Sequence, residues 1–149
     1  MIRVQTEDFD VGAEIKALRE GKTNIGGVVS FVGLVRDLAG DRSIDTMTLD
    51  HYPGMTEKML AKIEAEAIER WDLDASLIIH RYGPLSPGDH IVLTITASAH
   101  REAAFEANEF LMDWLKTKAP FWKRETGKDG DRWIDAKSGD DDAADRWSR

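Results

Sequence analysis

The spacing of hydrophobic residues changes several times along the chain, and these changes predict its secondary structure. Short apolar or alternating stretches predict strands at residues 2–5, 26–35, 46–52, 76–85 and 90–98, with a turn and a short strand at 127–135. Apolar residues that recur every third or fourth position predict helices at residues 10–21, 54–71 and 100–118. This order predicts an α+β fold with one mixed or antiparallel sheet and three main helices.

The three predicted helices have recognisable ends and inner faces. Asp10 is expected as the N-cap of the first helix and Gly21 as its stop, while Pro120 ends the third. The inner positions expected on the second and third helices are Met55, Met59, Leu60, Ile63, Ala67, Ala103, Ala107, Phe110, Leu111 and Trp114.

The stretch GGVVSFVGLV, residues 26–35, is almost wholly apolar and predicts a strand buried on both faces. Arg36 follows it and opens the polar stretch 36–45, which we expect to be a mobile loop. Gly33 lacks a side chain, so we expect it to let a ligand approach the backbone of Leu34 and Val35.

Length and composition restrict the function further. The 149 residues suit a single domain, expected at 1–137, with an acidic and flexible tail at 138–149. The absence of cysteine excludes disulfides, thiolate metal sites and cysteine nucleophiles. No apolar run suggests a membrane helix and the start lacks a secretory signal, so we expect a cytoplasmic protein with no membrane partner.

The segment LKTKAPFWKRE, residues 115–125, is unusual in a chain with a net charge of −8. It places Lys116, Lys118, Lys123 and Arg124 within nine positions, so it is either a solvated helix end or a docking site for an anion. Lys116 lies opposite the apolar helix face and is explained as a solvated lysine. Apolar rings and other cations flank Lys123, so we expect it to have a lowered pKa, which suits proton transfer or nucleophilic work.

A second candidate anion site lies at the start of the third helix. There His100 and Arg101 would add an imidazole and a guanidinium to free backbone N–H groups, although two exposed polar residues are an equally good explanation. The other histidines, His51, His80 and His90, are interpreted as surface or strand residues, and no metal site is expected because the spacing is wrong.

Three stretches of the chain together resemble a known family. VVSFVGLVRD, HRYGPLSPGDHIVLTITASAHREAAFEA and LMDWLKTKAPFWKRE are similar to the large, catalytic subunit of molybdopterin synthase. The resemblance implies an α/β-hammerhead fold and a homodimer within a heterotetramer. It also implies a ubiquitin-like small subunit as partner, whose C-terminal Gly-Gly thiocarboxylate supplies sulfur to cyclic pyranopterin monophosphate, with no cofactor required.

The resemblance also implies roles for individual residues. It marks Lys116 and Lys123 as catalytic. Its substrate-binding positions fall on Leu34, Val35, Arg36, His100, Arg101, Arg124 and Glu125. Lys137 stands where relatives carry an arginine, and a lysine keeps the charge but loses the bidentate geometry.

The spacing of these residues predicts a composite site. His100 and Lys116 are sixteen residues apart on one expected helix, which is roughly 24 Å at the rise of an α-helix. One small pterin cannot easily touch both, so we expect the two ends to come from different protomers.

Two other functions remain as alternatives. The chain could be a non-catalytic docking module for a ubiquitin-like tail, or it could bind single-stranded nucleic acid through its aromatic and cationic residues. The net charge of −8 disfavours nucleic acid as a partner.

Overall fold

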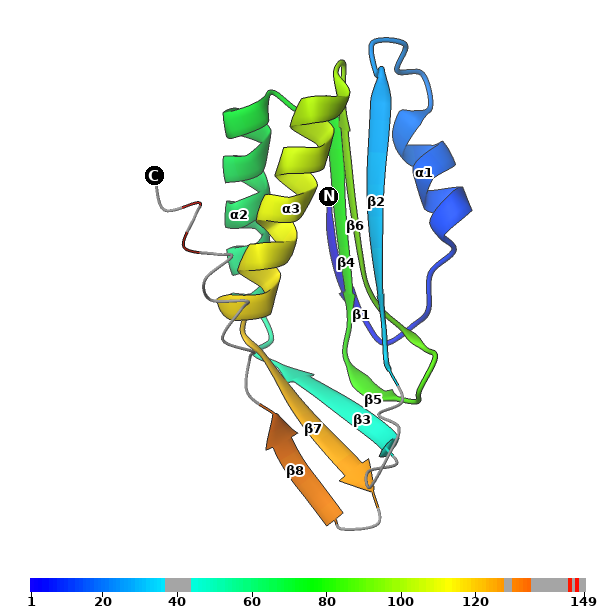
Figure 1. Ribbon diagram of the computed structural model, residues 1–149, viewed down its shortest axis with the longest axis vertical. Coiled ribbons are helices and arrows are strands. Elements are labelled where there is room, and N and C mark those ends of the chain that lie inside the picture. The colour runs from blue at the N-terminus through cyan, green and yellow to red at the C-terminus, as the bar shows by residue number, and fades with distance from the viewer. Residues whose placement is uncertain (37–43, 128–129, 135–144, 146, 148–149) are drawn as a thin grey trace.

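Two four-stranded sheets organise the chain (Figure 1), whose computed structural model describes residues 1–36, 44–127, 130–134, 145 and 147. The elements are β1 (Ile2–Gln5), α1 (Val11–Arg19), β2 (Gly27–Leu34), β3 (Ile44–His51), α2 (Met55–Trp71), β4 (Ala75–Arg81), β5 (Gly83–Leu85), β6 (His90–Ser98), α3 (Arg101–Thr117), β7 (Phe121–Gly127) and β8 (Gly130–Ile134). The predicted α+β class is confirmed, but the strands form two sheets where the sequence predicted one.

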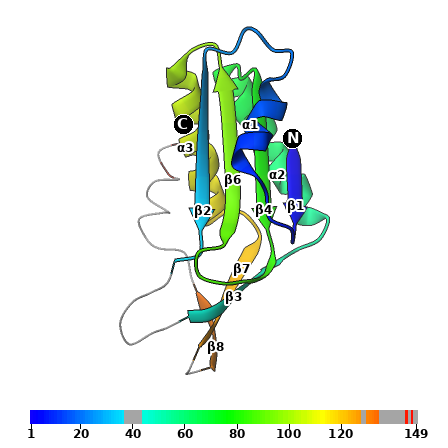
Figure 2. The same cartoon turned by 90° about the vertical axis from the view of Figure 1, so that its right-hand side faces the viewer.

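The larger sheet forms the middle layer of a three-layer body. Its strand order is β1-β4-β6-β2, with β1 parallel to β4 and the other pairs antiparallel. Helices α2 and α3 cover one face and α1 covers the other (Figures 1 and 2). Ile78 and Val92 pack toward α2 and α3, whereas Leu77, Leu93 and Ile95 pack toward α1. The central strands β4 and β6 are therefore buried on both faces.

Strand β2 does not have the burial that its apolar sequence predicted. It is the edge strand of the larger sheet and pairs only with β6, and Ser30, Phe31 and Leu34 are exposed. The prediction of a strand buried on both faces is wrong for β2, because it lies at an edge of the sheet where α3 packs on one face, while α1 on the other face packs over β4.

The smaller sheet projects from one end of the body (Figure 1), with the order β5-β3-β7-β8 and all pairs antiparallel. Residues 76–85 were predicted as one strand, but they divide into β4 in the larger sheet and β5 in the smaller. Gly83 begins β5 with φ of +88°, a backbone conformation that side chains strongly disfavour. This turn lets the chain cross from one sheet to the other.

The helices begin and end close to the predicted positions. Asp10 caps α1 by accepting a hydrogen bond from the Ala13 backbone N–H at 3.0 Å, and α3 ends at Thr117, ahead of Pro120. No helix in the described ranges is long and apolar enough to cross a membrane.

The buried faces of α2 and α3 differ from the predicted ones because polar residues occupy core positions. Thr56, Glu64 and Asn108 are buried, whereas Met55 is exposed. Each buried polar group has a partner: Thr56 donates to the Tyr52 carbonyl, Glu64 accepts from the Ser76 hydroxyl, and Asn108 bonds to β6. A buried polar side chain with its hydrogen bonds satisfied escapes most of the desolvation penalty, so hydrophobicity alone misplaces the inner face.

Candidate active site

A tight turn of the chain sets Lys116 and Lys123 on adjoining elements. Helix α3 ends at Thr117, and β7 begins only four residues later at Phe121. The turn is closed by the Phe121 backbone N–H, which donates to the Ala119 carbonyl at 2.8 Å. Lys116, in the last turn of α3, is exposed, and Lys123 on β7 is partly buried.

A buried histidine lies close to both lysines. His80, on β4, is 8% exposed, and its ring stacks flat on Phe121 with 3.6 Å between ring centroids. Its Nδ1 lies 2.8 Å from the Arg81 carbonyl oxygen, which can only accept, so Nδ1 carries the proton. Burial, and then the positive charges of Lys123 and Lys116, lower the pKa of His80 to about 4, so the ring is neutral at pH 7.

The register between β3 and β7 places a second histidine on the same face. His51 pairs with Phe121, and Leu49 pairs with Lys123, so these four side chains lie on one face of the smaller sheet. The His51 ring contacts Tyr82 at 4.3 Å and Phe121 at 6.2 Å between centroids. We call His51, His80, Tyr82 and Phe121 the aromatic block.

The strand-end segment Leu34–Arg36 is held at the junction of the two sheets. Val35 is buried against Met47 and Leu85 of the smaller sheet. Its N–H donates to the Asp89 carbonyl at 2.9 Å, and its carbonyl accepts from the Gly88 N–H at 2.7 Å. Both polar backbone groups of Val35 are therefore engaged within the protein, and its exposed neighbours, Leu34 and Arg36, are the ones that face solvent.

The structure gives a reason for glycine at position 33 that differs from the one the sequence suggested. A Cβ at this position would lie 2.7 Å from Cγ1 of Val92 on β6. The missing side chain therefore makes room for Val92. The expectation that it opens the backbone to a ligand is replaced by this packing requirement.

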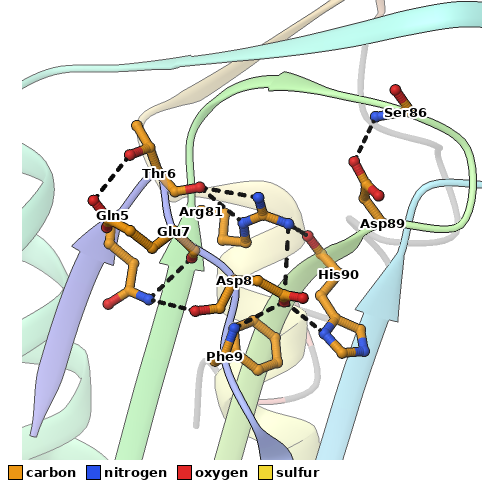
Figure 3. A network of polar contacts seen from close by, with 9 residues as sticks. All are labelled: Gln5, Thr6, Glu7, Asp8, Phe9, Arg81, Ser86, Asp89 and His90. Atoms are coloured by element: carbon orange, nitrogen blue, oxygen red, sulfur yellow. Dashed lines mark hydrogen bonds and ion pairs between the residues drawn. The ribbon is translucent and has the colours of Figure 1, made fainter.

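A polar network fixes the turn that holds Val35 (Figure 3). Asp8 accepts hydrogen bonds from the Phe9 backbone N–H and from His90 Nδ1, both at 2.8 Å, and these two donors lower its pKa. Arg81 donates to the carbonyls of Thr6 and His90. The turn itself is closed by the Ser86 N–H, which donates to the Asp89 carboxylate at 2.8 Å.

His100 and Arg101 lie at the opposite end of α3 from Lys116. His100 is the N-cap residue, its side chain makes no capping hydrogen bond, and both residues are exposed. Helix α3 is continuous from Arg101 to Thr117, so the predicted separation of roughly 24 Å applies within one chain. One chain does not bring its two cationic ends together.

The other predicted site residues are only partly placed. The backbones of Arg124 and Glu125 lie on β7, opposite Thr48 and Met47 of β3. Lys137, most of the loop predicted at 36–45, and the boundary predicted between 1–137 and 138–149 lie outside the described residues. Trp147, from the segment predicted as a loose tail, contacts Trp71 and Phe110 and donates to Asp113 at 2.6 Å.

Sequence reasoning missed His51 and His80, which it interpreted only as surface or strand histidines. The available signal was their position: His80 sits inside the apolar run of β4, and His51 ends β3 beside the start of α2. A histidine within an apolar strand needs a reason to be buried, and here the reason is the stack on Phe121.

Comparison with known proteins identifies the family of the chain. The model of the family described as MoaE protein matches residues 4–118. The chain belongs to the MoaE family. Its similarity to individual members extends over nearly the whole chain. A relative from Mesorhizobium japonicum named "Molybdopterin synthase catalytic subunit" is 53% identical over 148 residues, covering 98% of this chain and 92% of the relative.

Solved structures of MoaE proteins share the fold. The "Molybdopterin biosynthesis MoaE protein" from Burkholderia ambifaria is 53% identical with a TM-score of 0.83, covering 99% of this chain and 98% of that one. The structure titled "Molybdopterin Synthase from Staphylococcus aureus" is 32% identical with a TM-score of 0.81, covering 89% of this chain and 95% of that one. The hammerhead fold implied by the sequence resemblance is thus confirmed.

Proposed function

We propose that this MoaE chain is the catalytic subunit of molybdopterin synthase. It accepts sulfur from the C-terminal thiocarboxylate of a ubiquitin-like small subunit and transfers it to cyclic pyranopterin monophosphate, in the cytoplasm. The observation that carries the proposal is the tight turn between α3 and β7, which sets Lys116 and Lys123 on adjoining elements with both charges acting on His80. A cationic site in a chain of net charge −8 suits two anionic substrates.

The two lysines supply the electrostatic part of the reaction. The thiocarboxylate sulfur attacks the pterin side chain and forms a thioester with it. Water then adds to the acyl carbon, and negative charge develops on the acyl oxygen before the C–S bond breaks. The sulfur stays on the pterin, and the small subunit is left with a carboxylate. A positioned donor that stabilises such an oxyanion typically contributes about 3 to 4 kcal/mol. Lys123 is partly buried, so its charge is less screened than that of the exposed Lys116. It is therefore the better candidate for also moving a proton during attack on the pterin side chain.

The phosphate is held by a second group of cations, which comes from a partner copy. His100 and Arg101 lie roughly 24 Å along α3 from Lys116, too far for one pterin. The site is therefore composite, with this pair from one protomer and Arg36, Lys116 and Lys123 from the other. This requirement agrees with the homodimer within a heterotetramer that the family resemblance implies.

The remaining predicted residues complete the pocket. Exposed Leu34 and Arg36 flank the fixed Val35 and present an apolar and a cationic side chain where the two sheets meet. Arg124 and Glu125 continue β7 beyond Lys123. Lys137 lies outside the described residues, and only the family resemblance suggests a role for it in substrate binding.

Reconstitution tests the function. The chain is mixed with a thiocarboxylated small subunit and cyclic pyranopterin monophosphate, and dithiolene product is measured. Lys123→Ala should reduce product formation by about 10²- to 10³-fold or more, since it removes an oxyanion donor. Lys118→Ala is the matched control, because Lys118 is an exposed cation of the same segment.

The outcomes separate the enzyme from its rival. Product from the native chain, with loss in Lys123→Ala and not in Lys118→Ala, supports catalysis. Tight binding of the small subunit without any product would instead identify a non-catalytic docking module.

A further inference from the structure

The lysine site contains two histidines that have no role in the function proposed above. His51 and His80 come from different sheets and meet Phe121, the first residue of β7. Phe121 is two residues before Lys123 and directly follows the turn that begins after Lys116. Any movement of the Phe121 ring therefore moves the start of β7, and Lys123 with it.

The contacts of His80 make it a rigid support for that ring. His80 lies on β4, in the middle of the larger sheet, and its neighbours Ile78 and Ile79 are completely buried. Its Nδ1–H donates to the Arg81 carbonyl, which fixes the orientation of the imidazole. Phe121 then stacks on it with 14° between the ring planes. The position of β7 is thus set against a buried central strand of the larger sheet.

His51 supports the same residue from within the smaller sheet. It is the direct cross-strand partner of Phe121, and Lys123 is its diagonal neighbour on the same face, at a distance of about 7 to 8 Å between Cα atoms. Its Nδ1 is buried and has no hydrogen-bond partner among the described residues. An N–H at that atom would be buried without an acceptor, so the neutral tautomer with its proton on Nε2 is favoured.

The His80 ring thus lacks a charge at a position where a positive charge would face two lysines. The groups that face His80 are Lys123 from β7, Lys116 from α3 and His51 from β3. A cationic imidazole there would repel both lysines in a partly buried setting, where Coulomb interactions are weakly screened.

We infer that His51 and His80 are positioning residues of the lysine site, which hold Phe121 within the aromatic block and so set Lys123 beside Lys116. The expected effect on kcat rests on the proposed function. The expected effect on the position of Lys123 rests only on the geometry of the aromatic block. Neither histidine needs to touch substrate for it to hold.

Neutral substitutions at His80 separate ring stacking from hydrogen bonding. His80→Phe keeps a flat uncharged ring against Phe121, whereas His80→Asn keeps a donor for the Arg81 carbonyl and loses the stack. A displacement of the order of 1 Å at a reacting group costs up to about 10²-fold in rate, so His80→Asn should lower kcat at least about tenfold. His80→Phe should stay within about threefold of the native kcat, because it conserves shape.

The kinetic pattern distinguishes positioning from general damage. KM for the pterin should change by less than about twofold in both variants, since uniform substrate binding is not removed and the residues proposed to hold the phosphate are not altered. A native kcat for His80→Asn, or a loss confined to KM, would overturn the inference. If His80→Asn fails to fold, Phe121→Leu is used in its place, because it removes the same ring stack by changing the other partner. The same changes in kcat and KM are expected for it.

A measurement without substrate keeps this inference separate from the proposed function. The pKa of Lys123 is measured by NMR of its ε-carbon in the native chain, in His51→Phe and in His51→Lys. The signal of Lys123 is assigned by its absence from the spectrum of Lys123→Arg. His51→Lys places a cation beside Lys123 and should lower its pKa by about half a unit or more, while His51→Phe leaves it near the native value. An unshifted pKa in His51→Lys would contradict the stated proximity. Absence of product from the native complex would refute the proposed function alone.

Discussion

Acid should destabilise the fold through one buried side chain, His80. The ordinary pKa of a histidine is 6.5, and in the folded chain burial and the neighbouring Lys123 and Lys116 hold it at about 4. Because the folded pKa lies below the unfolded one, the unfolded chain binds this proton more tightly. The full stability is present above pH 6.5, falls as the pH drops from 6.5 toward 4, and changes no further through this group below that.

The size of the effect follows from the two pKa values. They differ by about 2.5, and each pKa unit corresponds to 1.36 kcal/mol, so protonation of His80 costs about 3 kcal/mol in total. At pH 4.5 most of this cost is already present, roughly 2 to 3 kcal/mol. This is a large share of the 5 to 15 kcal/mol by which domains of this size are typically stable.

Urea unfolding at pH 7.0 and pH 4.5 measures the loss directly, in the native chain and in His80→Phe. Other groups titrate in both proteins between these two pH values. The loss of unfolding free energy in the native chain is therefore compared with the loss in His80→Phe, and the difference between the two is due to His80. The pKa of Asp8 is lowered from 3.8, so its contribution falls off only below this window. The free energy of unfolding should fall by about 2 kcal/mol or more further in the native chain than in His80→Phe. Equal losses in the two proteins would show that His80 does not titrate as its burial requires.

Two further predictions concern packing. Asn108 accepts from the Thr94 hydroxyl at 3.0 Å and donates to the Val29 carbonyl at 3.1 Å; Asn108→Leu should therefore cost about 2 to 4 kcal/mol, and adding Thr94→Val should recover part of it, because both partners are then apolar. A purely additive double-mutant cycle in urea would contradict this coupling. Gly33→Ala should lower stability by about 1 to 3 kcal/mol because its Cβ would meet Val92. Gly12→Ala is the control, whose Cβ has an ordinary contact at 3.6 Å and which should be neutral or slightly stabilising in thermal unfolding.

Local sequence patterns determined the elements whose signals lie within a few residues. The helices follow from the helical period of their apolar residues, from the Asp10 cap and from Pro120. The cluster of cations in residues 115–125 and the pair at the start of α3 were also visible, because each lies within one short segment. Their distance along a single helix predicted that one small ligand would bind between two protomers.

Tertiary structure alone decided which elements are covered and which side chains meet. β2 and β4 are both apolar, yet one is an edge and the other is central, because burial depends on neighbours distant in sequence. The mixed sequence of β7 has no strand period, and pairing with β3 makes it a strand. The same pairing sets His51 beside Phe121 and, through the stack on His80, Lys123 beside the end of α3. Contacts between residues so far apart in sequence leave no periodic signal, which is why the support of the lysine site was seen only in the folded chain.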